Sequence, residues 1–385
     1  MTTTPTPSRL KKTGRLIVSD SERCADMLYA VGMFVPDSFI WAEIEGQPLV
    51  IVSPLEAGRM ATGVKGNTTV YNVDEIMESW KLQDRKILTQ LLGLSKHFAV
   101  GRWVVPYDFP LGLAESLDSH GISCAPEEKA FFPERECKTP AEINYLREGV
   151  QLAESGLLRG IEVLKEATIQ GTDLIWQGSI LTAEILRGEI DSHICKQGGI
   201  AAHTIVAPGP EGADPHNAGS GPIHPNEPII IDIFPRVTAT GYFGDLTRTV
   251  VKGQAPDIVK QAFEAVRDAR DRAKAAIHAN ANGKEIHQTV AGILTDHGFE
   301  TDLKSSPPKG FFHGTGHGLG LEIHEMPRIS SVEHVLKAGH VVTIEPGVYY
   351  PEWGGVRLED VVVVTSDGCE DLTSVPTLLE IDSWS

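Results

Sequence analysis

Four acidic residues lie within apolar, strand-like runs of this chain, in two similar arrangements around a glycine-rich segment. Asp232 and Asp245 stand on either side of a polar break, each beside several isoleucine, leucine or valine residues. Glu345 and Glu359 repeat the pattern further along the chain, and His317 lies between the two pairs. Apolar runs separated by such a break predict a β-hairpin. The carboxylates require an explanation, because burying an ionised carboxylate without a partner is very costly.

The chemistry that these residues suit is the binding of divalent metal ions. Four buried carboxylates facing one another would protonate unless a positive charge lay among them. If Asp232 pairs directly with Asp245, then Ile233 stands opposite Gly244, and side chains about 5 Å apart would touch one metal or bridge two. One imidazole with four hard oxygen ligands suits a pair of manganese, cobalt, iron or zinc ions better than magnesium or calcium. A solvated strand end explains either glutamate alone, but not the whole set.

The motifs around these residues resemble those of the superfamily of methionine aminopeptidase, aminopeptidase P and prolidase, whose catalytic domain has the pita-bread fold. The similarity covers the Tyr242–Thr249 arm, the run around His317, the Thr343–Gly347 strand and the Arg357–Asp360 segment. The interval between the two aspartates is slightly longer than is usual in prolidases, which predicts an extended turn. The metal ligands that the resemblance implies are Asp232, Asp245, His317, Glu345 and Glu359.

The resemblance also implies an activity. It is the hydrolysis of an amide bond, above all the Xaa-Pro bond of dipeptides or short peptides, by a hydroxide that bridges two metal ions. Glu345 would take a proton and pass it to the leaving nitrogen. His216 and His324 would stabilise the tetrahedral intermediate, and His324 would donate a hydrogen bond to the scissile carbonyl or shuttle a proton. His313 is expected to support the loop, because the glycines around it exclude a helical zinc site.

Three further side chains are candidates for contacts with substrate or ligands. Arg328 stands where some prolidases hold an arginine that binds the free carboxylate of a dipeptide, a task that suits the forked guanidinium. A surface arginine is the alternative. His203 stands where prolidase-like enzymes tend to have an aromatic side chain, so we expect it either to alter a pocket wall, as a substrate-binding residue, or merely to pack. Arg357 is expected to orient the metal ligands.

The chain of 385 residues is too long for one ordinary core, which predicts two domains. Thr139, Pro140 and Glu142 form a capping box with proline at the first helical position, and an apolar helical stripe follows them. We therefore expect a small N-terminal creatinase/prolidase-like α/β domain over 1–136. A pita-bread metallopeptidase catalytic domain of α/β (α+β) class, with a pseudo-twofold internal repeat, is expected over 137–385. In the first domain we expect a hairpin over 39–52 and helices around 20–32 and 74–92.

Composition narrows the class of partner. The net charge of −18 argues against nucleic acid or an anionic membrane, since either would be repelled. No stretch approaches the length of a membrane span. The polar start at 1–8 is expected to be disordered and lacks the apolar core of a signal peptide. The five cysteines have no Cys-x-x-Cys spacing, which favours a reducing cytoplasm. We expect a small peptide or small amide as substrate and a homodimer as the assembly.

Three alternatives share this scaffold. One is a non-peptidase, such as an ectoine hydrolase-like or creatinase-like amidohydrolase or a dimethylsulfoniopropionate lyase-like enzyme; the intact ligand set counts against the creatinase branch. Another is a non-catalytic binding module like those of histone chaperones, which have lost ligands and carry charged tails. The third, methionine aminopeptidase itself, usually lacks a domain before the catalytic one.

Overall fold

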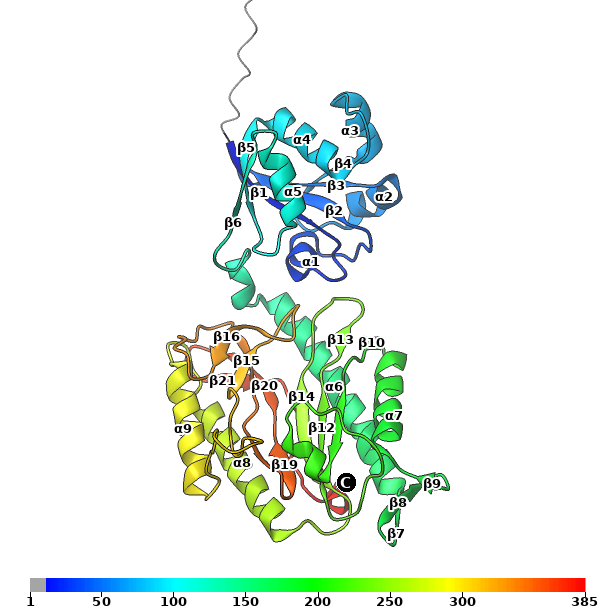
Figure 1. Ribbon diagram of the computed structural model, residues 1–385, viewed down its shortest axis with the longest axis vertical. Helices are drawn as coiled ribbons and strands as arrows, with labels where there is room; N and C mark the ends of the chain where they lie inside the picture. Colours follow the sequence, from blue (N-terminus) through cyan, green and yellow to red (C-terminus); the bar gives the residue numbers. More distant parts are fainter. Residues whose placement is uncertain (1–11, 385) are drawn as a thin grey trace, which may run out of the picture. The chain divides into compact units, whose positions relative to one another are not determined.

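The computed structural model describes residues 12–384, and the chain divides into two compact units, one ending at Pro133 and one beginning at Glu134. Figure 1 shows both units. The expectation of disorder at 1–8 lies outside the described residues. No helix of the described part is long and apolar enough to cross a membrane.

The first unit is a mixed six-stranded sheet covered by helices on both faces. The strand order is β4-β3-β2-β1-β5-β6, and the expected hairpin over 39–52 is present as β2 and β3. The strands are β1 (Lys12–Ser19), β2 (Phe39–Ile44), β3 (Gln47–Val52), β4 (Thr69–Asn72), β5 (Val100–Val105) and β6 (Ser123–Pro126). The helices are α1 (Ala25–Val31), α2 (Pro54–Gly63), α3 (Val73–Ser79), α4 (Ile87–Phe98) and α5 (Leu111–Asp118).

Alternation along β1 divides the core of this unit into two layers. Leu16 packs with residues of α3, α4 and α5, whereas Ile17 packs with residues of α1 and α2. The single helical stretch expected at 74–92 is wrong, because α3 and α4 are separate helices and Lys81 between them has a positive φ of 55°. The helix expected near 20–32 is the shorter α1.

The second unit begins with the expected helix. Thr139 caps it, Pro140 opens it, and the reciprocal Thr139–Glu142 capping box is formed. The remaining helices of this unit are α7 (Ala183–Lys196), α8 (Asp257–Ala276) and α9 (Gly283–Asp296), after α6 (Pro140–Glu166). Short 3-10 helices occur at Pro133–Glu136, Gly209–Ala213 and Ile381–Ser383.

Two helix-backed sheets form the body of this unit, as Figure 1 shows. One is the antiparallel sheet β11-β12-β14, packed with α6 and α7, and the other is β16-β15-β17-β20-β21, packed with α8 and α9. The first contains β11 (Ile205–Pro208), β12 (Pro228–Ile233) and β14 (Leu246–Val251). The second contains β15 (Gly316–Gly318), β16 (Glu325–Ile329), β17 (Val341–Ile344), β20 (Asp360–Val364) and β21 (Cys369–Asp371). The two halves thus repeat one arrangement of paired helices and a central hairpin.

Smaller strands complete the unit. They are β7 (Thr168–Gln170), β8 (Asp173–Trp176), β9 (Ser179–Ile180), β10 (Gly199–Ile200), β13 (Arg236–Val237), β18 (Gly347–Tyr350) and β19 (Gly354–Arg357). Every residue of β12, β14 and β20 is buried. This burial explains why β12 and β20 appear in the sequence as nearly continuous apolar runs.

The register expected for the aspartate hairpin is wrong by two residues. Asp232 pairs with Thr247, and Ile233 pairs with Leu246. The extended turn keeps the same register at the bridge between Arg236 and Phe243. Asp245 therefore lies diagonal to Asp232 on the same face of the sheet, where neighbours are about 7–8 Å apart and still interact.

The glutamate hairpin has the register that brings its two acids face to face. Ile344 pairs with Asp360 in β17 and β20, and Gly347 pairs with Arg357 in β18 and β19. Both ladders share one register, so Glu345 stands opposite Glu359 at the interruption between them.

Candidate metal centre

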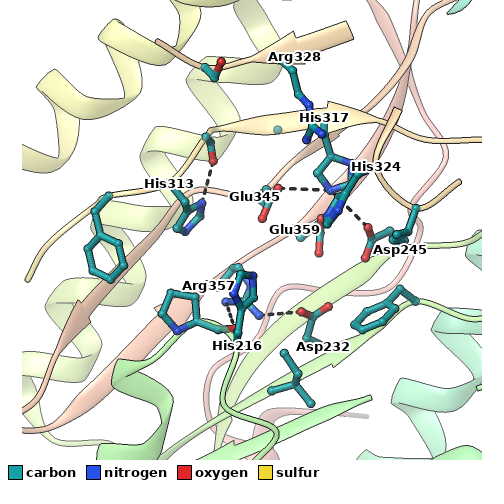
Figure 2. A pocket seen from close by; sticks show the side chains of 18 of the residues that line it. His216, Asp232, Asp245, His313, His317, His324, Arg328, Glu345, Arg357 and Glu359 are labelled. Carbon is teal, nitrogen blue, oxygen red and sulfur yellow. Dashed lines mark hydrogen bonds and ion pairs between the residues drawn. The ribbon is translucent and has the colours of Figure 1, made fainter. Parts of the chain in front are cut away.

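One cavity of the second unit, about 580 Å³ in volume, contains all five expected metal ligands. They come from four places: β12, the residue before β14, the glycine-rich β15, and the interruption of the glutamate hairpin. Figure 2 shows their side chains converging from the two sheets. The expected ligands that line the cavity are Asp232, Asp245, His317, Glu345 and Glu359.

His317 is the centre of this group. Its Nε2 atom lies 3.4 Å from Oε1 of Glu345 and 3.7 Å from Oδ2 of Asp245. Asp245, His317 and Glu359 each offer one ligand atom, and these atoms all lie within 4.8 Å of one another. Such an arrangement would allow one cation to contact all three side chains.

Glycine allows the strand of His317 to enter the centre. A Cβ on Gly316 would lie 1.9 Å from the carbonyl oxygen of Thr343, and one on Gly318 would lie 2.2 Å from that of Met326. The backbone of β15 can therefore approach both neighbouring strands only without side chains at these positions. The close approach expected from the glycines is confirmed.

Hydrogen bonds from outside the group orient two of the acids. Nη2 of Arg357 donates to Oδ2 of Asp232 at 2.7 Å, whereas the buried Oδ1 of Asp232 has no hydrogen-bond partner within the described residues 12–384. The hydroxyl of Thr247 donates to Oε2 of Glu359 at 2.8 Å. An unpaired buried carboxylate oxygen is costly, so the free Oδ1 indicates a missing cationic partner.

His313 and Tyr349 extend the contacts of Arg357. Nη1 of Arg357 donates to the Tyr349 hydroxyl at 2.9 Å, and that hydroxyl lies 2.8 Å from Nε2 of His313. Nδ1 of His313 lies 2.8 Å from the carbonyl oxygen of Gly314. Burial lowers the pKa of His313 to about 3, so the ring is neutral, and Tyr349 donates to Nε2 while Nδ1–H donates to Gly314. His313 thereby holds the glycine-rich loop.

Arg357 compensates only part of the negative charge of the four carboxylates. Burial raises the pKa of Asp245 well above its usual value, and the neighbouring Asp232 and Glu345 raise it further. Burial, followed by the same kind of repulsion, raises the pKa of Glu359 in the same way. Burial raises the pKa of Glu345 to about 7. A divalent cation would remove the repulsion and replace the lost hydration, so these residues fit a metal centre.

His317 fits the same interpretation. Burial, then the charge of the nearby His324, lower the pKa of His317 to about 3. The imidazole is therefore neutral, and its close contacts with Asp245 and Glu345 are not ion pairs. A neutral ring nitrogen directed at carboxylates is the form in which histidine ligates metal.

The side chains that were expected to contact the substrate do not all lie in this cavity. His216, His324 and Arg328 line the same cavity, and the ring of His324 lies 4.4 Å from the ring of His317 in a T-shaped arrangement. Burial lowers the pKa of His324, and Arg328 lowers it further. The guanidinium of Arg328 forms no hydrogen bond or ion pair with any residue between 12 and 384 that the structure describes.

His203 does not lie in this group. Its side chain is exposed, its φ is 63°, and it does not line the cavity. It stands in the turn before β11, whose next residues are buried, so the turn directs it away from the site. The pocket-wall expectation for His203 is not met in this cavity. Sequence reasoning missed Tyr349 and Thr247, since neither carries a motif apart from the strands that contain them.

A helix-backed pair of sheets with a carboxylate and histidine centre between them is the architecture of a metallopeptidase. The chain belongs to metallopeptidase family M24, whose pattern matches residues 144–366. The Xaa-Pro dipeptidase of Pyrococcus furiosus is 33% identical over 241 residues, which are 61% of this chain and 62% of that protein. The putative dipeptidase YkvY of Bacillus subtilis is 30% identical over 341 residues, 86% of this chain and 85% of that protein.

Solved structures show the same fold over nearly the whole chain. The X-Pro aminopeptidase of Thermotoga maritima has a TM-score of 0.80 at 22% identity, covering 96% of this chain and 97% of that one. The prolidase of Pyrococcus furiosus has a TM-score of 0.76 at 24% identity, covering 94% and 96%. The mixed α/β fold expected from the sequence is confirmed.

Proposed function

We propose that this protein hydrolyses the Xaa-Pro bond of dipeptides or short peptides with the help of two divalent metal ions. The observation that carries the proposal is the convergence of four carboxylates and the neutral His317 in a single cavity that His216, His324 and Arg328 also line. The names of the relatives, Xaa-Pro dipeptidase above all, support the choice of bond.

The metal ions would be held by Asp232, Asp245, His317, Glu345 and Glu359. When bound, they would supply a water of lowered pKa and polarise the amide carbonyl. Four carboxylates and one imidazole suit manganese, cobalt, iron or zinc.

The protein side chains would do the remaining work. Glu345 would accept the proton from the attacking water and deliver it to the leaving nitrogen. His216 and His324 would donate hydrogen bonds to the carbonyl oxygen as negative charge develops on it. Their placement in the same cavity as Glu345 supports this division of roles.

Arg328 would select the substrate. Its guanidinium lines the cavity without a partner among residues 12–384, so it is available to the free carboxylate of a dipeptide, which its fork can hold with two hydrogen bonds. The cavity of about 580 Å³ suits a small substrate. We therefore favour a dipeptide over a longer chain.

The remaining proposals concern the surroundings of the enzyme. We propose that the unit ending at Pro133 corresponds to the creatinase/prolidase-like domain and that the unit beginning at Glu134 is catalytic. The five cysteines are all free, which supports the cytoplasm as the compartment. The homodimer stays a prediction.

The test is a metal-dependent assay on matched peptides. Purified protein is stripped with a chelator, reloaded with manganese or cobalt, and offered Ala-Pro, Ala-Pro-Ala and Ala-Ala. We expect cleavage of the proline peptides only after reloading and little cleavage of Ala-Ala. Full activity after stripping would contradict the metal mechanism. No cleavage by fully loaded protein would favour a non-peptide substrate.

A further inference from the structure

A buried ionic cluster lies beside the cavity and has no part in the proposed chemistry. The side chain of Glu325 is 6% exposed, and its Oε2 accepts a hydrogen bond from Nζ of Lys138 at 3.0 Å. Its Oε1 accepts from Nη2 of Arg135 at 2.5 Å and from the backbone N–H of Glu322 at 3.0 Å. Although burial raises the pKa of Glu325, the charges of Lys138 and Arg135 lower it overall, so the group is an ionised carboxylate.

The loop before Glu325 is shaped around this carboxylate. A Cβ on Gly320 would lie 2.5–2.6 Å from its atoms, so the glycine makes room for it. Arg135 also contacts Oε2 of Glu322 at 2.9 Å. Residues 320–325 are thus tied at several points to the segment that precedes α6.

His324 directly precedes Glu325, which we call the anchor because Lys138 and Arg135 hold its carboxylate. Glu325 is the first residue of β16 and pairs with Gly318, next to His317. His324 lies in the bend that precedes β16 and lines the cavity, whereas Glu325 does not line it, so the two side chains have different surroundings. The imidazole of His324 has no hydrogen-bond partner among the described residues 12–384, and it packs against the ring of His317. Its position in the cavity, seen in Figure 2, therefore depends on its backbone.

We propose that Glu325, held by Lys138 and Arg135, is a positioning residue that places His324 for the reaction. Two charged groups are buried to hold one carboxylate, and such a cluster is costly unless its geometry is well satisfied. The three donors on Glu325 meet that condition. By holding Glu325, the cluster fixes the backbone next to His324 and thereby the position of the His324 ring. This inference rests on the proposed function.

The kinetic test separates positioning from general stability. In metal-loaded protein, Glu325→Gln is expected to lower kcat on an Xaa-Pro dipeptide about 10- to 100-fold, the scale of a misplaced catalytic group, with KM and bound metal unchanged. In a His324→Ala background the same substitution should change kcat less than about twofold, because the group that it positions is gone. Losses that multiply in the double variant would overturn the proposal.

Two further variants guard against a folding defect. Arg135→Gln leaves Lys138 beside the carboxylate and is the milder change; it should lower kcat without changing KM. Glu325→Gln leaves the buried ammonium of Lys138 without its carboxylate partner, and adding Lys138→Met removes that ammonium. We expect this pair to regain the thermal midpoint that Glu325→Gln loses while kcat stays low. If kcat recovers together with the midpoint, the role of Glu325 is structural and the proposal is wrong.

Hydrogen exchange tests the anchor without any assay of activity. Glu325→Gln should speed amide exchange in residues 319–325. Arg147→Gln, which breaks the more exposed Arg147–Glu370 pair of 2.7 Å in the same unit, should leave exchange there unchanged. Unchanged exchange in Glu325→Gln overturns the proposal even if the protein proves to be an Xaa-Pro peptidase. If wild type cuts no Xaa-Pro peptide, the proposed function fails instead. Hydrogen exchange alone then shows whether Glu325 holds residues 319–325 in place.

Discussion

Arg357 and Asp232 are 125 residues apart in the chain and form a buried pair in the cavity, with Nη2 and Oδ2 separated by 2.7 Å. The arginine uses the rest of its fork on Tyr349 and, through Nε, on Thr247 at 3.2 Å. It therefore fixes one oxygen of Asp232 and leaves the other, Oδ1, without a hydrogen-bond partner in the part of the chain that the structure describes. This relationship joins the two halves of the second unit at the point where the metal would bind.

Replacing Arg357 should weaken metal binding. Arg357→Lys keeps the charge, but a single ammonium cannot reach the three side-chain oxygens that the guanidinium contacts. We expect metal affinity to fall about 10- to 100-fold, as is usual when a group that orients a ligand is changed. Calorimetric titration of stripped protein with manganese measures it. Arg267→Lys, which alters an exposed pair with Glu264, is the control. Equal affinity in both variants would contradict this role.

Removing one acid should separate stability from metal binding. Glu359→Gln keeps an oxygen for the hydroxyl of Thr247 but removes one of the buried charges that repel one another. The metal-free variant should melt no lower than metal-free wild type, while the rise in melting temperature on adding manganese, the bound metal and the turnover should all be lost. Thermal scans and elemental analysis measure these effects. A variant that still gains stability from manganese would show that Glu359 is not a ligand.

The stability of the metal-free protein should depend on pH, because the carboxylates of the centre are buried close to one another. Burial raises the pKa of Glu345 from its ordinary 4.5 to about 7 in the folded chain. Between these values the folded protein holds more protons than the unfolded one, so the contribution of Glu345 is full below pH 4.5 and is lost as pH rises through about 7. Metal binding displaces the proton and has the opposite dependence.

Urea unfolding at pH 5.5 and pH 8 measures this prediction. The free energy of unfolding of metal-free wild type should decrease over this interval relative to that of Glu345→Gln, which cannot titrate at this site. Manganese affinity of the wild type should increase over the same interval. Parallel pH curves for the two metal-free proteins would contradict the assignment.

Substitution of His324 and substitution of His313 should have different effects, the first on turnover and the second on stability. His324→Ala should lower kcat by about two to four orders of magnitude, the scale expected for a positioned acid or hydrogen-bond donor, without loss of metal. His313→Ala removes the contacts with Tyr349 and Gly314 and should cost about 1–3 kcal/mol of unfolding free energy. Turnover, bound metal and urea unfolding are measured for both. Loss of metal from His324→Ala would exclude its catalytic role.

Arg328 should decide the length of the substrate. In wild type, kcat/KM for Ala-Pro should exceed that for Ala-Pro-Ala, because only the dipeptide presents its carboxylate to the guanidinium at that site. Arg328→Ala should remove most of this preference, a change of about 1.5–3 kcal/mol for a charge-assisted bond. If the tripeptide is preferred by wild type, or the ratio is unchanged in the variant, Arg328 is not the carboxylate site.

The types of the ligand residues were accessible from the sequence because their chemistry conflicts with their surroundings. Acids in runs of isoleucine and valine cannot be explained by solubility, and the glycines near His317 have a steric purpose that any close approach of strands requires. The start of α6 was equally predictable, since the Thr139–Glu142 capping box is formed by residues three apart. These features depend on neighbours in the chain.

The features that the sequence did not determine depend on contacts between distant segments. The aspartate hairpin shifted by two residues because its turn continues the strand ladder through Arg236 and Phe243, and periodicity alone does not decide where a ladder ends. The pairing of Arg357 with Asp232, and of Lys138 with Glu325 across 187 residues, required the packed sheets and helices. Residue types thus specified which groups need partners, whereas only tertiary packing, which buries those groups beside one another, decided which partners they have.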